Sequence, residues 1–315
     1  MSGDASGERV DSTTGERRSS AASMMLALLV AARPRQWVKN GFLFAPLLFS
    51  RNLFHPTLLL RAFAAFALYC AVASAVYLAN DVLDAEQDRL HPVKKRRPVA
   101  SGRLPARLAA VVAAGLAVVG VGLGTLLEPT FGACLAAYLA INAAYSSVLK
   151  KLAYVDVVVI ASGFVLRVLA GARAIDVPTS EWLFVCTFWL ALFLGLGKRK
   201  HELLVAEDAG SGASTRHALK RYDLRWVSRW LWAAGIAAVG SYLLYTLSPE
   251  THAKFGSYIL AATLPFPALG VLRFGVLAGR ADRATSPTEA LITDGPFVIN
   301  LVLWLGAVVA ILYRG

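Results

Sequence analysis

The side chains best suited to chemistry are three acids and an amide that follow a long apolar run: Asn80, Asp81, Asp84 and Asp88. If the chain continues as a helix at about 100° per residue, the four lie within one sector of roughly 100°, with Glu86 on the far side. Carboxylates this close repel one another unless a cation lies among them. We therefore predict a divalent ion held by Asp81, Asp84 and Asp88. Mg²⁺ fits best, because it uses few carboxylates and completes its shell with water and phosphate oxygens.

The plain alternative is that these acids only solvate the exposed end of a helix. A solvated end does not require acids on a shared face. It also does not favour acids placed directly before the four basic residues 94–97. We therefore prefer the metal site.

A second polar cluster follows the apolar run 181–197. In a helix, Lys198, Arg199 and Glu202 share a face, while Lys200 and His201 turn away. Two bases and one acid suit a phosphate-bearing ligand with its metal. The alternative is that the bases only anchor the cytoplasmic end of a membrane span.

Other polar residues lie at or near the ends of apolar runs: Lys39, Asn40, Asn142, Tyr145, Ser146, Lys150, Asp156 and Arg167. Asp156 and Arg167 are eleven residues apart and fall on the same helical face. An ionisable residue inside a span is a functional candidate because exposing it to lipid costs several kcal/mol. For Arg167, a structural role as partner of an acid in a neighbouring helix remains equally open.

The composition indicates a membrane protein with many spans. The 315 residues are 57% hydrophobic and 17% charged, with a mean hydropathy of +0.57. A net charge of +12 would suggest nucleic acid in a soluble protein, but here the charges are confined to loops, so we predict no nucleic-acid partner. Of the 32 Lys and Arg residues, 26 fall on one side of the predicted spans. That side is cytoplasmic by the positive-inside rule, and both polar clusters face it. The three cysteines show no disulfide or metal-ligand spacing.

The apolar runs predict an all-α integral membrane protein with about nine transmembrane helices, at 37–54, 57–79, 105–127, 130–149, 153–173, 181–197, 228–247, 256–277 and 294–313. The first run is the weakest, because it is short and carries Lys39 and Asn40 near its start. Residues 1–20 are predicted to be disordered. Residues 21–32 are predicted to form an interfacial helix rather than a signal peptide, since basic residues follow directly. We expect one polytopic domain, 21–315, with cytoplasmic cap loops at 80–104 and 198–227.

Three motifs together resemble the signature of the UbiA superfamily of intramembrane prenyltransferases: Asn80-Asp81-x-x-Asp84-x-x-x-Asp88, Arg97-Pro98 with Ser101-Gly102, and Tyr145-Ser146-x-x-Leu149-Lys150. The resemblance begins at about residue 33. It implies nine transmembrane helices around a central cavity that opens to the cytosol and to lipid. It also implies Mg²⁺ and a diphosphate bound beneath a cytoplasmic cap.

One departure from the superfamily pattern is informative. Aromatic prenyltransferases of the superfamily carry a second aspartate-rich motif after the sixth helix, where this chain has Lys198-Arg199-Lys200-His201-Glu202. Fewer carboxylates and more bases favour an additional phosphate on the ligand.

The basic second motif resembles that of the decaprenyl-phosphate phosphoribosyltransferase branch of the superfamily. The same branch is indicated by the run Arg33-Pro34-Arg35-Gln36-Trp37-Val38-Lys39-Asn40. The resemblance implies a plasma-membrane enzyme that transfers phosphoribose from 5-phosphoribosyl 1-diphosphate to a polyprenyl phosphate. Pyrophosphate would leave, and the product would be a precursor of cell-wall arabinan.

The residues suit this chemistry. Breaking the bond from ribose C1 to diphosphate builds negative charge on the leaving group, which Mg²⁺ on Asp81 and Asp84 would stabilise. Further predicted substrate contacts are Lys39, Asn80, Asp88, Arg97, Tyr145, Lys150, Asp156, Lys198, Arg199 and Glu202. Among these, Lys198 and Arg199 would hold the 5-phosphate, and Tyr145 would orient a phosphate oxygen or the ribose. The acceptor phosphate is already an anion, so no general base is required.

Two other functions remain alternatives. A superfamily member that uses a prenyl diphosphate donor fits the acidic motif equally, but it does not fit the basic second motif. A cation-coupled transporter would use Asp156 and Arg167, but the charges here lie at helix ends rather than near the membrane midplane. A homo-oligomer is compatible with the sequence, which does not specify an oligomeric state.

Overall fold

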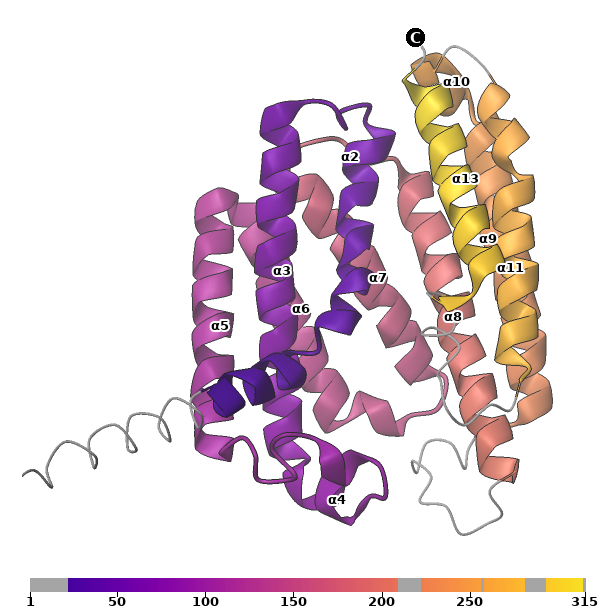
Figure 1. Cartoon of the computed structure of the whole chain (residues 1–315). Coiled ribbons are helices and arrows are strands. Elements are labelled where there is room, and N and C mark those ends of the chain that lie inside the picture. Colours follow the sequence, from indigo (N-terminus) through magenta and orange to yellow (C-terminus); the bar gives the residue numbers. More distant parts are fainter. Residues whose placement is uncertain (1–21, 209–221, 256–257, 281–292, 314–315) are drawn as a thin grey trace, which may run out of the picture. The chain divides into compact units, whose positions relative to one another are not determined.

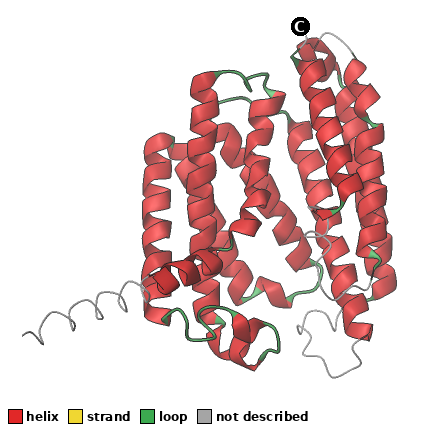
Figure 2. Cartoon of the chain, viewed as in Figure 1, coloured by secondary structure: helices red, strands yellow, loops and turns green. Residues whose placement is uncertain are grey.

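A computed structural model of the chain describes residues 22–208, 222–255, 258–280 and 293–313. In these ranges the chain is helical and contains no strand (Figure 2). The predicted all-α class is therefore confirmed. The tail predicted to be disordered, 1–20, lies outside the described residues, as does 209–221 of the predicted second cap loop.

The described residues fall into two compact units. The first unit takes its residues from Met1–Asn40 and Ala67–Gly124, and the second from Gly41–Phe66 and Thr125–Gly315. In Figure 1 the helices are coloured along the sequence, from indigo at the N-terminus to yellow at the C-terminus.

The first unit is built around small residues. It comprises the helix Ala22–Ala32, the start of η1 (Pro34–Phe44), most of α3 (Pro56–Leu83) and α5 (Ala106–Leu127), and the short elements α4 (Ala85–Leu90) and η2 (Lys94–Arg96). Its core consists of Ala27, Ala31, Leu78, Ala85, Val99, Leu104, Ala109 and Ala113. Gly120 allows α5 to pack closely on α3, because a Cβ there would lie 2.5 Å from a methyl group of Val72.

The helix Ala22–Ala32 matches the helix predicted at 21–32. Ala27 and Ala31, four residues apart, are buried on one face. Met25, Leu26 and Leu29 are more than half exposed. This division of small buried and large exposed apolar residues suits a helix that packs on protein and faces lipid.

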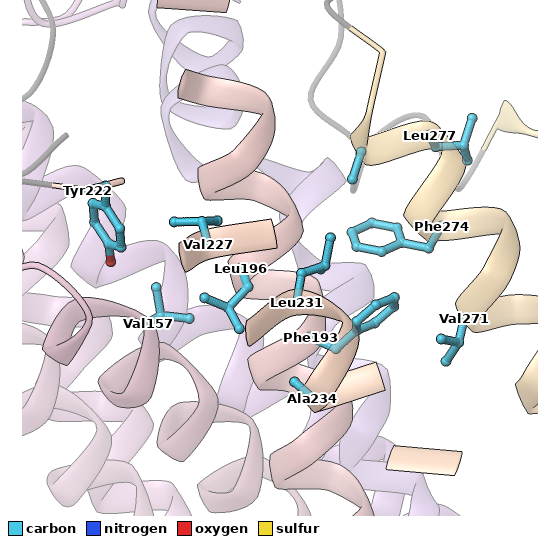
Figure 3. Packing of buried hydrophobic residues seen from close by; sticks show 11 residues of the cluster. Val157, Phe193, Leu196, Tyr222, Val227, Leu231, Ala234, Val271, Phe274 and Leu277 are labelled. Carbon is cyan, nitrogen blue, oxygen red and sulfur yellow. The ribbon is translucent and has the colours of Figure 1, made fainter. Parts of the chain in front are cut away.

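The second unit is a set of packed helices: α2 (Ala45–Phe49), α6 (Pro129–Ser147), η3 (Leu149–Lys151), α7 (Val155–Ala174), α8 (Glu181–Asp208), α9 (Leu224–Leu247), α10 (Pro249–Phe255), η5 (Ile259–Thr263), α11 (Pro265–Ala278) and α13 (Gly295–Leu312). Its main apolar cluster joins α7, α8, α9 and α11 (Figure 3). Within this cluster, the rings of Phe193 and Phe274 meet edge to face with centroids 5.0 Å apart. This packing holds α8, which carries the second predicted polar cluster.

Seven helices in the described ranges are long and apolar enough to cross a membrane: Pro56–Leu83, Ala106–Leu127, Val155–Ala174, Glu181–Glu207, Leu224–Leu247, Ile259–Ala278 and Gly295–Leu312. The chain is therefore a multi-pass membrane protein, although the predicted count of nine is not confirmed. The first predicted run, 37–54, is divided between η1 and α2, with Pro46 at the start of α2. The predicted span 130–149 forms α6, whose last turns carry Asn142, Tyr145 and Ser146 and make it less apolar than the seven.

The hydrogen bonds of Arg61 explain how this arginine is accommodated in the apolar helix α3. Its Nε donates to the carbonyl of Ala174 at 2.9 Å and its Nη2 to that of Leu127 at 3.2 Å. These carbonyls end α7 and α5, where intrahelical partners run out. A cation at a helix C-terminus is also favoured by the helix dipole. Arg61 therefore closes two helix ends of the second unit.

Candidate functional site

The predicted acids lie where α3 passes into α4. Asp84 interrupts the helix as the N-cap residue of α4, but the chain keeps its helical course. The Asp84 amide donates to the carbonyl of Asn80 at 2.9 Å, and the Asp88 amide donates to that of Asp84 at 2.8 Å. The continued helix predicted for this segment is therefore observed, with a break of one residue.

Arginines hold two of the acids together. Arg97 Nη1 lies 2.6 Å from Asp88 Oδ2 and 3.4 Å from Asp81 Oδ1. Arg33 Nη2 donates to the same Asp81 Oδ1, and Lys94 Nζ lies 4.0 Å from Asp88 Oδ1. Arg97 was predicted to be a substrate contact, whereas no sequence pattern identified Arg33 as the partner of Asp81. The two residues are 48 positions apart, so only the folded chain shows the pairing.

Burial differs sharply between the two signs of charge. The side chains of Asp81 and Asp88 are 1% and 3% exposed, whereas those of Arg33 and Arg97 are 30% and 28% exposed. Water and ligands therefore meet the arginines first. Asp84 is half-buried.

The donor set fits a magnesium ion that arrives with a phosphate ligand. Among the described residues, no group of three or more His, Cys, Asp or Glu side chains is close enough to hold a metal. Asp81, Asp84 and Asp88 therefore do not form the group of three ligands for one metal ion that the sequence predicted. Mg²⁺ commonly takes only one or two carboxylates and fills its shell with water and phosphate oxygens. The buried carboxylates of Asp81 and Asp88, which share Arg97, suit that form of binding.

The start of η1 is attached to α3 within the first unit. Asn40 is buried, and its amide donates to Cys70 Sγ at 3.2 Å. Trp37 Nε1 donates to Ser74 Oγ at 3.1 Å. Lys39 lies between Trp37 and Asn40 in the sequence, so these two contacts hold the chain on either side of it. Lys39 is half-buried, as is Asn80.

Around Arg199, the second unit holds a cluster of side chains that come from three segments. Arg199 Nη2 lies 2.8 Å from Asp156 Oδ2, and Nη1 donates to Glu202 one turn along α8. The Arg199 and Asp156 side chains are 3% and 1% exposed, and that of Glu202 is 26% exposed. Asp156, Arg199 and Glu202 were each predicted from the sequence, and the fold brings them into direct contact.

Tyr222 completes this cluster and was not predicted. Its hydroxyl donates to Asp156 Oδ1 and accepts the backbone N–H of Tyr154 at 2.8 Å. Burial and the bond to Asp156 both raise the pKa of the Tyr222 phenol. The backbone of Tyr154 is left-handed, with a φ of 66°. Its ring packs against that of Tyr222, with the ring centroids 4.6 Å apart. No spacing in the sequence connects Tyr222 with Asp156, because the residues are 66 positions apart.

The remaining predicted residues of the second unit lie at half-buried positions. Lys198, Tyr145 and Lys150 are all half-buried. Tyr145 is close enough to Arg199 to interact with its charge. His201, predicted to turn away, is buried with Nδ1 2.9 Å from the carbonyl of Arg280.

Arg167 has neighbours that favour a structural role. Its Nη1 donates to the carbonyl of Gly163 at 2.8 Å, and its Nη2 donates to the Tyr138 hydroxyl at 3.3 Å. The guanidinium also lies over the rings of Tyr138 and Phe164 at 5.0 and 5.3 Å. These contacts stabilise a buried cation inside α7.

Comparisons with known proteins give a consistent result. Residues 41–292 match the model of the UbiA prenyltransferase family. The chain is 31% identical over 303 residues to the decaprenyl-phosphate phosphoribosyltransferase of Mycolicibacterium smegmatis, covering 92% of this chain and 94% of that protein. It is 33% identical over 292 residues to the protein of the same name from Mycobacterium tuberculosis, covering 91% and 94%. Its fold resembles a UbiA homologue from Archaeoglobus fulgidus bound to GPP and Mg²⁺, with a TM-score of 0.64 and 18% identity over 91% of this chain and 99% of that one.

Proposed function

The chain belongs to the UbiA prenyltransferase family, and we propose that it transfers a 5-phosphoribosyl group from 5-phosphoribosyl 1-diphosphate to a polyprenyl phosphate. Pyrophosphate is released, and the lipid-linked product is a precursor of cell-wall arabinan. The observation that carries the proposal is similarity over nine-tenths of the chain to relatives that are named for this acceptor and this transferred group. We also propose that the enzyme lies in the plasma membrane with its polar clusters on the cytoplasmic side.

The acidic pair of the first unit suits the donor's diphosphate. Asp81 and Asp88 would hold Mg²⁺, with Asp84 and Asn80 beside them in the sequence. When bound, the ion would supply positive charge against the leaving pyrophosphate. Arg97 is already fixed between the two carboxylates, so its remaining N–H groups are oriented for phosphate oxygens. Lys39 adds a further cation in this unit.

The cluster of the second unit suits the 5-phosphate. Arg199 is held rigidly by Asp156 and Glu202, which fixes the direction of its guanidinium. Those two carboxylates also offset its charge, so net attraction for an anion has to come from other cations. Lys198, beside Arg199 in α8, supplies that charge in the proposal. Lys150 and Tyr145 contribute a second ammonium and a hydroxyl for phosphate or ribose.

The acceptor needs little help from the protein. A polyprenyl phosphate is anionic at neutral pH, so its oxygen attacks ribose C1 without a general base. Attack on the face opposite the leaving group inverts the anomeric configuration. The prenyl tail would lie along the apolar outer surfaces of the helices, where residues such as Leu123 and Leu126 are exposed.

The direct test uses purified protein in lipid nanodiscs with decaprenyl phosphate and radiolabelled donor. Label should enter the lipid fraction from 5-phosphoribosyl 1-diphosphate in the presence of Mg²⁺, and chelation should abolish transfer. Transfer from a prenyl diphosphate instead would contradict the proposed donor. Asp81→Asn should reduce turnover at least about a hundredfold, because charge stabilisation of the leaving group is lost. Glu86→Gln is the matched control, since Glu86 is an exposed acid of the same segment, and it should retain full turnover.

A further inference from the structure

Arg33 is paired with the carboxylate of Asp81, which the proposed metal would also need. It donates to Asp81 Oδ1, the oxygen that also faces Arg97 Nη1 at 3.4 Å. Asp81 is 1% exposed and lies against these two arginines. A divalent ion that coordinates Asp81 in this arrangement would lie against two guanidinium groups. Such an approach is opposed by like-charge repulsion.

Cations already offset the acids in this arrangement. Asp81 and Asp88 carry two negative charges, and Arg33, Arg97 and Lys94 place three positive charges within 4.0 Å of them. Adding Mg²⁺ alone would add two further positive charges beside carboxylates that are almost fully buried. Adding Mg²⁺ together with a diphosphate brings compensating negative charge, and the phosphate oxygens take up the displaced arginines. A guanidinium is well suited to this exchange, since its planar N–H groups match a phosphate as well as a carboxylate.

Arg33 is anchored at its backbone and more exposed at its side chain. It ends the helix Ala22–Ala32, with its N–H donating to the carbonyl of Val30 at 3.2 Å. Its φ of 54° is left-handed, and Pro34 directly follows. The side chain is 30% exposed, and its guanidinium carbon lies 5.0 Å from the centre of the Tyr77 ring. The guanidinium therefore borders the solvent while its Cα remains fixed at a helix end.

We propose that Arg33 is a diphosphate-binding residue, which stays on Asp81 in the free protein and moves to phosphate oxygens when metal and diphosphate enter together. The consequence is that the site takes up the metal as its diphosphate complex rather than as the bare ion. The proposal rests on the proposed function only for the presence of a metal and a diphosphate at Asp81, and it does not depend on which group is transferred.

The test measures metal binding without turnover. Mn²⁺ replaces Mg²⁺, and the Mn²⁺ retained by purified full-length protein is measured by equilibrium dialysis, because pyrophosphate also binds Mn²⁺ in solution and lowers its free concentration without protein. The wild type should bind Mn²⁺ weakly alone and at least about tenfold more tightly with inorganic pyrophosphate. Arg33→Ala should bind Mn²⁺ alone about tenfold more tightly than the wild type, because a competing cation is gone, and should lose most of the pyrophosphate enhancement.

Arg35→Ala is the matched control, because Arg35 is an exposed arginine two residues along the chain; it should match the wild type in both measurements. An Arg33→Ala protein that binds Mn²⁺ alone no more tightly than the wild type, or keeps the full enhancement, would overturn the proposal. If that variant does not fold, Arg33→Lys keeps the charge but not the planar donors. It should bind Mn²⁺ alone as the wild type does and show a reduced enhancement, and an unchanged enhancement would overturn the assignment. Normal results here with no phosphoribosyl transfer would contradict the proposed function alone.

Discussion

The Tyr222 hydroxyl donates a hydrogen bond to the Asp156 carboxylate, which in turn holds Arg199 at 2.8 Å. Tyr222 lies directly before α9, Asp156 in the first turn of α7 and Arg199 within α8. A buried carboxylate thus receives a donor from each of two different segments. Asp156 is therefore central to how the second unit holds its polar cluster.

Replacing Tyr222 with Phe should lower stability at neutral pH by about 1–3 kcal/mol, because Asp156 loses a donor and the Tyr154 N–H loses its acceptor. Thermal unfolding in detergent measures this change. Tyr258→Phe is the control, since Tyr258 is 52% exposed, and it should leave the midpoint unchanged. An equal midpoint in Tyr222→Phe and the wild type would contradict this role for the hydrogen bond.

The same residue predicts a loss of stability at alkaline pH. The folded pKa of Tyr222 is raised above the ordinary tyrosine value of about 10. Its stabilising contribution is thus complete below about pH 10 and is lost as the pH rises from there toward the folded value. The stability difference between wild type and Tyr222→Phe should therefore shrink above about pH 10. A difference that stays constant from pH 8 to pH 11 would exclude this linkage.

Lys198 and Arg199 should respond differently to replacement. Arg199→Ala leaves Asp156 buried and without its cation, so the protein should lose roughly 3–5 kcal/mol of stability. Lys198→Ala should lose less stability than Arg199→Ala and should raise the donor KM about tenfold or more, because the phosphate contact proposed for Lys198 is lost.

Donor titrations and thermal unfolding on the same samples separate the two effects. Arg225→Ala is the control, since Arg225 is exposed at the start of α9, and it should alter neither quantity. An unchanged KM in Lys198→Ala would remove Lys198 from the phosphate site.

Gly171 should tolerate no side chain. A Cβ at this position in α7 would lie 2.0 Å from the backbone carbonyl oxygen of Leu43, and a backbone atom cannot turn aside as a side chain can. Gly171→Ala should therefore destabilise the protein by about 2 kcal/mol or more. The control is Gly122→Ala in α5, where a Cβ meets nothing within 4 Å; it should be neutral or stabilising by up to about 1 kcal/mol. Equal unfolding midpoints for the two variants would contradict the close approach.

The helical class and most spans follow from the sequence, because long apolar runs have one structural solution in a membrane, where every backbone N–H and C=O must be bonded within its own segment. The runs at 57–79 and 294–313 reappear as α3 and α13 for this reason. The weakest predicted span, 37–54, is divided between η1 and α2, at positions where Pro46 and polar residues offset its apolar character.

The site was predictable only in part. Helical spacing placed Asp81 near Asp88 and Arg199 near Glu202, since residues three, four or seven apart share a face whatever lies around them. Two partners that stabilise these carboxylates are Arg33 for Asp81 and the Tyr222 hydroxyl for Asp156, and each pair is separated by 48 or more positions. Local periodicity contains no information about such pairs. Only tertiary packing decided them, because a buried charge is stabilised by whichever opposite charge or donor the folded chain brings within hydrogen-bonding distance.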